Sequence, residues 1–148
     1  MKTRIIALML LVMGSVAAYG QTYDSGDKEL DSQLKTINTD AKKDWDKFKT
    51  ETSAKYNTTL DKIEALIQLG MAAADIIMAH EVSLIVLRPV DDVVACYEKN
   101  KGKGWGVIAK EMGIKPGSAE FHKLKGNCKN KSNNGNGKSK GKGKGKKK

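Results

Sequence analysis

The sequence predicts an all-α protein: a long N-terminal amphipathic helix or helical hairpin, packed on a small helix-turn-helix-like C-terminal module and followed by a disordered basic tail. Apolar residues recur at helical spacing from residue 28 to residue 70. The chain has two prolines, both after residue 88, so no proline interrupts helices in its first half. The 148 residues are long enough for one small domain. Because only 5% of them are aromatic, we expect its core to be aliphatic.

Residues 1–20 have the pattern of a secretory signal peptide. Four residues with two cations precede an apolar run at 5–18, and small residues follow at positions suited to signal cleavage. We expect cleavage between Gly20 and Gln21, although a cut after Ala17 also fits the pattern. Cleavage would place the protein in the periplasm or outside the cell. The alternative, an uncleaved membrane anchor, would need about 20 apolar residues.

A polar lead at 21–27 precedes the longest helical pattern, at 28–70. Its stripe is apolar except for Thr52 and consists of Leu30, Leu34, Ile37, Ala41, Trp45, Phe48, Thr52, Tyr56, Leu60, Ile63, Leu66 and Ile67. No proline or glycine interrupts 28–69, which allows one continuous helix, but Asn57-Thr58-Thr59 has low helix propensity and could bend or break it. Because the spacing is not a strict heptad, we favour a hairpin or bundle helix over a parallel coiled coil.

Residues 71–126 form the expected helical module. The most apolar part of the mature chain is 65–87, and three ionisable residues interrupt it: Asp75, His80 and Glu81. We therefore interpret it as a core helix and not as a membrane span. Four residues would form its buried face: Met71, Ala74, Ile77 and Met78. The apolar run 84–87 should end this helix as a buried connector, and Pro89 should begin the next one.

The stretch 105–124 has the pattern of a helix-turn-helix. A short helix is followed by Gly113 as a left-handed cap and by Ile114 as an apolar plug. Ser118 would then begin a last short helix, which Gly126 would end. The inward-facing residues would be Trp105, Ile108, Ala109, Met112, Phe121 and Leu124. Since recognition helices are usually longer and carry base-reading polar residues, we favour a packing or protein-contact role, with DNA binding as a lesser alternative.

The run GKGWGVIAKEMGIKPGSAEFHKLKG, together with PVDDVV at 89–94, resembles a module of small exported bacterial proteins. Those proteins carry a similar G-x-G-W-G-x-I-A-x-x-L-G-I-x-P-G-S run ahead of an F-H-x-L-K helix. Met112 stands where that pattern usually has leucine, which is a conservative change in a core. The resemblance covers about a quarter of the chain and implies export and a fold module, not an activity.

Positive charge is concentrated near the C-terminus. Residues 21–98 carry nine basic and 15 acidic side chains, whereas 99–128 carry seven lysines and two acidic residues. From residue 129 onward there is no acidic residue and no hydrophobe, so we expect 127–148 to be disordered. The candidate polyanion-binding residues are Lys129, Lys131, Lys138, Lys140, Lys142, Lys144, Lys146, Lys147 and Lys148.

A lysine tail of this kind attracts polyanions through counterion release and diffuse electrostatics. For an exported protein these are anionic lipid, lipopolysaccharide or extracellular nucleic acid, bound without sequence preference because no aromatic residues alternate with the lysines. The sequence therefore predicts an exported, non-enzymatic envelope or secreted protein that is attached by its tail. The alternative is a helical protein-interaction module, pairing with itself or a partner through Trp45, Phe48 and Tyr56, whose tail only aids solubility.

We expect no catalytic, cofactor or metal site and no small-molecule substrate. Neither His80 nor His122 has a serine or cysteine at a spacing that suggests nucleophilic catalysis, and no cysteine pair has metal-type spacing. In an oxidising compartment Cys96 and Cys128 could form a disulfide that ties the base of the tail to the body. Two unpaired thiols are the alternative.

Overall fold

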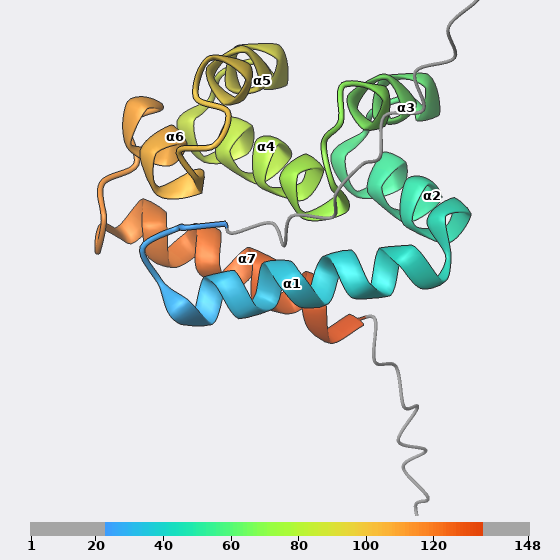
Figure 1. Ribbon diagram of the computed structural model, residues 1–148, viewed down its shortest axis with the longest axis horizontal. Helices are drawn as coiled ribbons and strands as arrows, with labels where there is room; N and C mark the ends of the chain where they lie inside the picture. Colours follow the sequence, from blue (N-terminus) through green and yellow to red (C-terminus); the bar gives the residue numbers. More distant parts are fainter. Residues whose placement is uncertain (1–22, 135–148) are drawn as a thin grey trace, which may run out of the picture.

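The computed structural model describes residues 23–134, and these residues form seven α-helices and no strand (Figure 1). The helices are α1 (Lys28–Lys43), α2 (Trp45–Tyr56), α3 (Leu60–Gln68), α4 (Ala73–Val86), α5 (Val90–Lys99), α6 (Trp105–Glu111) and α7 (Ala119–Asn134). The all-α prediction is confirmed for this part of the chain. The predicted signal peptide and the last fourteen residues lie outside the described residues.

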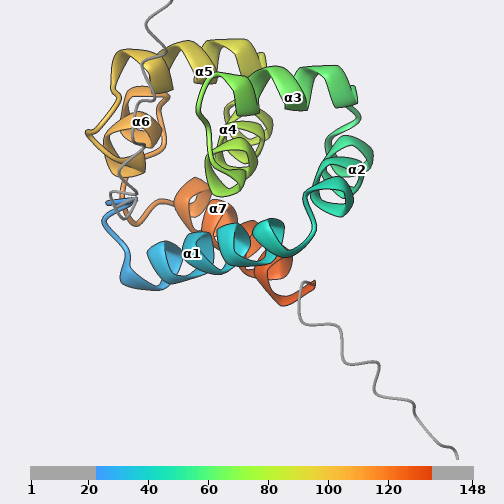
Figure 2. The same cartoon turned by 45° about the vertical axis from the view of Figure 1, so that its right-hand side comes forward.

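Helix α4 is the centre of the fold, and the other helices surround it (Figures 1 and 2). It packs against α1, α2, α3, α5 and α7, while α1 and α7 lie side by side beneath it. Every residue from Ala73 to Val82 is buried, including the three ionisable ones. A helix that is enclosed on all sides belongs to a core, so the core-helix interpretation of 65–87 is confirmed for 73–82. Residues 65–68 instead belong to α3, and Leu69, Leu84 and Leu87 are exposed. No helix in the described part of the chain is long and apolar enough to cross a membrane.

The pattern at 28–70 folds as three helices, so a single continuous helix was the wrong alternative. The predicted weak point at 57–59 is one of the two breaks: Asn57 is left-handed with φ 50°, and the hydroxyl of Thr59 caps α3 by accepting from the amide of Lys62. The sequence analysis missed the other break. Asp44 ends α1 and caps α2, because its carboxylate accepts from the amide of Lys47 at 2.9 Å.

Most of the predicted stripe is buried. Leu30, Leu34, Ile37, Ala41, Phe48, Ile63 and Leu66 belong to the core. Leu60 was wrongly assigned to the stripe: it is the first residue of α3 and is 47% exposed. The buried connector at 84–87 was also wrong: α4 continues to Val86, and Leu84 and Leu87 are exposed. Leu87 ends the helix in a left-handed conformation, φ 55°.

The polar lead is a structural element and not a loose connection. Its residues 23–25, here called the N-terminal clasp, lie across the start of α6. The amide of Trp105 donates to the carbonyl of Tyr23 at 2.7 Å, and the amide of Gly106 donates to that of Asp24 at 3.1 Å. Tyr23 and Ser25 are buried. The clasp therefore supplies acceptors for helix amides that have no partner inside α6.

The turn after α6 has the predicted geometry. Gly113 is left-handed with φ 98°, Ile114 is buried, and its amide donates to the carbonyl of Ala109 at 2.8 Å. The hydroxyl of Ser118 accepts from the amide of Phe121 at 3.2 Å, which confirms the predicted cap.

The expected end of the last helix at Gly126 was wrong. Helix α7 continues to Asn134, so residues 127–134, which we expected to be disordered, are helical. Packing against α1 and α4 supplies the stability that the glycine lacks, because Leu124 and Cys128 are fully buried there. Instead of standing free as a recognition helix, α7 is one wall of the core.

Candidate polyanion-binding surface

Two of the nine candidate lysines lie on α7, and both are held by carboxylates of the body. Lys129 is 3.5 Å from Glu29 of α1, and Lys131 is 2.9 Å from Glu51 of α2. The Lys131 side chain is only 13% exposed. Because their charge is already partly compensated, these two lysines belong to the folded body and not to the free polycation.

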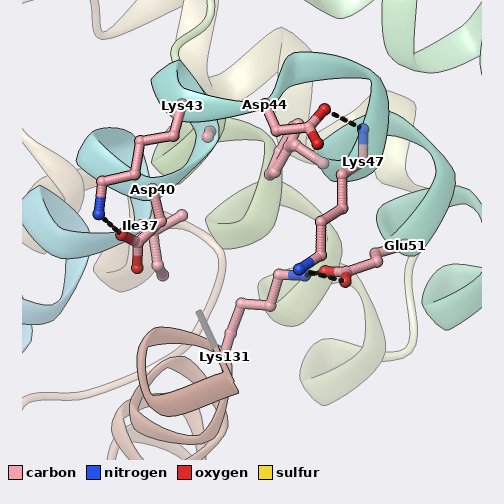
Figure 3. Close-up of a pocket in the computed structure, with 9 residues that line it drawn as sticks. Ile37, Asp40, Lys43, Asp44, Lys47, Glu51 and Lys131 are labelled. Atoms are coloured by element: carbon pink, nitrogen blue, oxygen red, sulfur yellow. Dashed lines mark hydrogen bonds and ion pairs between the residues drawn. The ribbon is translucent and has the colours of Figure 1, made fainter. Parts of the chain in front are cut away.

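Lys131 reaches into a groove of about 200 Å³ where α1, α2 and α7 meet (Figure 3). Figure 3 shows its amine beside Glu51, which Lys47 also approaches, at 3.8 Å. The charged residues that line the groove are three lysines and three carboxylates: Lys43, Lys47, Lys131, Asp40, Asp44 and Glu51. Since the charges balance, this groove offers no net attraction for a polyanion.

Lys125 adds to the attachment of α7. Its amine lies 3.0 Å from Asp27 and 2.7 Å from Glu29, the carboxylates at the start of α1. Both carboxylates have a pKa below the usual range. For Asp27 the main cause is the hydrogen bond from the backbone amide of Leu30, followed by that from Lys125. For Glu29 the main cause is the hydrogen bond from Lys125. Lys125 thus ties the first half of α7 to the start of α1, while Lys129 and Lys131 tie its second half to α1 and α2.

The other seven candidates, Lys138, Lys140, Lys142, Lys144, Lys146, Lys147 and Lys148, lie outside the described residues. They follow directly on α7, and the segment that contains them has no acidic residue. Across residues 23–134, by contrast, 18 basic side chains face 17 acidic ones.

A buried polar cluster around Glu81 was not predicted from the sequence. This carboxylate accepts from the amine of Lys55 and the hydroxyl of Tyr56, both at 2.6 Å, and from the side-chain amide of Asn127 at 2.7 Å. Burial acts to raise the pKa of Glu81, but the donors from Lys55 and Tyr56 outweigh it and hold the pKa below the usual range. The cluster joins α2, α4 and α7. An acidic residue within an apolar helix was the sequence signal that a buried partner was needed.

A second buried carboxylate, Asp75, lies in the first turn of α4. It accepts from the indole of Trp105 at 2.8 Å, from the amide of Ala72 at 3.0 Å and from the hydroxyl of Tyr97 at 3.2 Å. Burial raises its pKa, and the three neutral donors offset only part of that effect. Each carboxylate accepts three hydrogen bonds and joins separate helices, as expected of a structural group.

The two cysteines are free thiols in this structure. Cys96 lies on α5, with its sulfur 3.4 Å from a carboxylate oxygen of Glu111. Cys128 is buried on α7, with its sulfur 3.7 Å from that of Met78, and burial raises its pKa to about 12. The disulfide between Cys96 and Cys128 stays a prediction.

The described residues contain no group of three or more His, Cys, Asp or Glu side chains that could hold a metal ion. The ring of His80 is buried, and its Nδ1 lies 2.8 Å from the carbonyl oxygen of Ile76. The ring of Tyr56 stacks on it, with 4.7 Å between the two ring centroids. His122 is exposed near the start of α7.

No protein-family model matches this chain, and neither a curated protein nor a solved structure is similar to it. The resemblance of residues 89–126 to small exported bacterial proteins stays a prediction. Function is argued from the chain's own residues.

Proposed function

We propose that this is an exported, non-enzymatic protein that attaches to polyanionic surfaces through the lysines of residues 135–148. One observation carries the proposal: those fourteen residues have seven lysines and no acidic residue, whereas residues 23–134 are almost electrically balanced. Each lysine near an anionic surface contributes about 1 kcal/mol. The glycines between most of the lysines let each amine reach a separate anionic group.

The ion pairs on α7 refine the proposal. Lys129 and Lys131 are compensated by Glu29 and Glu51, so the attaching segment begins at Lys138 and not at Lys129. Its start is fixed by α7, which Lys125 ties to α1. The body is then carried at a surface by a segment that extends from one fixed point.

The test compares the chain from Gln21 to Lys148 with the same chain ended after Asn134, which keeps every described residue. Retention is measured on vesicles containing phosphatidylglycerol and on duplex DNA, at low and moderate salt. We expect the shorter chain to bind at least tenfold more weakly, and binding of the longer chain to fall as salt rises. Equal binding by the two chains would refute attachment through the tail.

A matched pair of substitutions tests where the attaching segment begins. Lys131→Gln and Lys147→Gln each remove one positive charge. We expect Lys147→Gln to weaken binding about threefold, within the limit of about fivefold per lysine, and Lys131→Gln to change it less than twofold.

Export is tested by the mass of the protein recovered from expressing cells: we expect loss of the first 20 residues. Intact precursor in the cytosol would contradict export.

The protein-interaction alternative was predicted to use Trp45, Phe48 and Tyr56, but Phe48 is buried in the core and the other two pack against it. A different surface is the observation in its favour. Leu84 and Leu87 are 57% and 89% exposed at the end of α4, and adjacent exposed leucines are typical of contact surfaces. Under this alternative the chain ended after Asn134 should self-associate, and Leu87→Lys should abolish the association. Sedimentation of both proteins distinguishes this role from tail attachment.

A further inference from the structure

A second groove lies between α6 and the start of α7, at the opposite end of α7 from the tail (Figure 1). It has a volume of about 430 Å³, and the N-terminal clasp forms one of its walls. Two cationic and three apolar side chains are among those that line it: Lys103, Lys110, Val107, Pro116 and Phe121. We call it the α6–α7 groove.

The lysines at this corner lack the compensation that the α7 lysines have. In the described part of the chain, no carboxylate lies within ion-pair distance of Lys103 or Lys110, nor of the neighbouring Lys115 and Lys123. Elsewhere in residues 23–134 the uncompensated lysines are spread along α1, at Lys28, Lys35 and Lys42.

The acidic side chains near the groove do not cancel this charge. Asp27 lines the groove, but it caps α1 and is bound by Lys125 at 3.0 Å. Asp24 also lines it, and Glu120 lies nearby in the first turn of α7. Glu111 follows Lys110 in the chain and interacts with Lys103, but it is shared with Lys99 at 3.7 Å. Lys103 and Lys110 line the groove, and with Lys115 and Lys123 next to lining residues the lysines of this corner outnumber its carboxylates.

Apolar groups accompany these cations. Val107 is 37% exposed on α6 and lines the groove together with Lys110 of the same helix and Lys103 of the preceding turn. Pro116 and Phe121 also line it. A phosphodiester backbone would need only the cations. Exposed apolar side chains among lysines suit the interface of a bilayer, where anionic headgroups lie next to acyl chains.

We propose that the α6–α7 groove is a second contact with anionic lipid: Lys103 and Lys110 bind a headgroup phosphate while Val107 enters the interface. This inference rests on the proposed function and adds the lipid class of the surface. Helix α7 has 16 residues and so places the two contacts about 24 Å apart on one rigid element. Two contacts on one molecule bind more tightly than either does alone and would orient the body on the membrane.

The test uses the chain from Gln21 to Lys148 and vesicles of phosphatidylcholine with 30% phosphatidylglycerol. Lys103→Gln/Lys110→Gln is compared with Lys35→Gln/Lys42→Gln, a control that removes the same charge from exposed, uncompensated lysines of α1. We expect roughly tenfold weaker vesicle binding for the groove pair and less than threefold for the control, because a lysine at the surface contributes up to about fivefold. Val107→Gln should weaken vesicle binding and leave DNA binding unchanged.

The outcomes separate this inference from the proposed function. If the groove pair binds vesicles as the control pair does, the groove contact is refuted, whatever the tail does. If the groove pair loses DNA binding as strongly as vesicle binding and Val107→Gln changes neither, the groove is a general phosphate contact and the lipid assignment is wrong. If truncation after Asn134 has no effect while the groove pair loses binding, the groove stands and the tail proposal fails. Circular dichroism confirms that each variant is folded.

Discussion

The two ends of the buried stretch of α4 stabilise a buried carboxylate in different ways. Both enclose a carboxylate, but Asp75 is held by the neutral donors of Trp105, Tyr97 and a backbone amide, whereas Glu81 is held by the cation of Lys55. Burial dominates at Asp75 and raises its pKa, while the donors dominate at Glu81 and lower it. A cation compensates a buried charge more fully than neutral dipoles do.

The difference also concerns what the donors could do without the carboxylate. The Lys55 side chain is 38% exposed and can turn into solvent. The Trp105 indole cannot, because Trp105 is 2% exposed and its backbone amide holds the N-terminal clasp. The Asp75 end therefore joins the first described residues to the C-terminal module, and the Glu81 end joins helices that have other contacts.

The largest expected effect comes from removing each carboxylate in turn. Asp75→Ala leaves a buried indole N–H without an acceptor and should destabilise the protein by about 3 kcal/mol. Glu81→Ala should cost about 2 kcal/mol, because Lys55 regains water while Tyr56 and Asn127 lose their acceptor. Urea unfolding followed by circular dichroism at pH 7 measures both. A larger loss for Glu81→Ala would contradict the comparison.

The second prediction concerns the clasp at the Asp75 end and uses two glycines with positive φ. A Cβ at Gly104 would lie 2.7 Å from Cβ of Asp24 and 2.9 Å from the carbonyl oxygen of Tyr23, whereas one at Gly113 would meet nothing within 4 Å. Gly113→Ala should cost about 1 kcal/mol through backbone strain alone. Gly104→Ala should cost about 2.5 kcal/mol, because it must also displace the clasp.

Unfolding in urea again measures the difference, and limited proteolysis locates it. Only Gly104→Ala should expose residues 23–25 to cleavage in an otherwise folded protein. Equal costs for the two substitutions would show that the clasp adds nothing to the stability of α6.

The predictable parts of the fold were those in which a short segment carries its own pattern. The stripe from Leu30 to Ala41 and the cap at Gly113 depend on neighbours within a few residues, and both were confirmed. The clasp was not predictable in this way. Gly104 has the pattern of a connecting residue and Gly106 that of a helix residue, and neither pattern indicates that the backbone about 80 residues earlier packs against them. Gly126 misled for the same reason: contacts with α1 and α4 decide where α7 ends.

The candidate polyanion-binding surface was also only partly predictable from the sequence. Its lysines could be found from composition, but which of them remain free depends on distant partners. Lys131 pairs with Glu51, 80 positions away, and Lys129 with Glu29, 100 positions away. Local sequence contains neither pairing, so the sequence analysis counted two compensated lysines as part of the tail.

The smallest effect, the pH dependence of stability, sharpens the comparison because the two ends of α4 should respond with opposite signs. Next to Glu81, burial lowers the pKa of His80 below its ordinary value of 6.5, although the carbonyl of Ile76 and the charge of Glu81 partly offset this. Its Nδ1 faces the carbonyl, and Nε2 has no partner among the described atoms, so a second proton would be buried without an acceptor. The unfolded chain then binds more protons than the folded one between the two pKa values. The stability that neutral His80 contributes is complete above pH 6.5 and is lost as the pH falls through the folded pKa.

At the other end the sign reverses. Asp75 has a raised pKa, so its contribution is complete below 3.8, the ordinary value, and is lost as the pH rises through the folded pKa. We therefore expect the urea concentration at the unfolding midpoint to be lower at pH 5.5 than at pH 7.5 in the unaltered protein. In His80→Gln, which can still donate to the carbonyl of Ile76, the midpoint should change much less between these two pH values. Asp75→Ala should keep the full slope or steepen it, because it removes the opposing contribution. The same slope in His80→Gln as in the unaltered protein would mean that His80 is not the group that titrates, and the contrast between the two ends would then rest on the carboxylates alone.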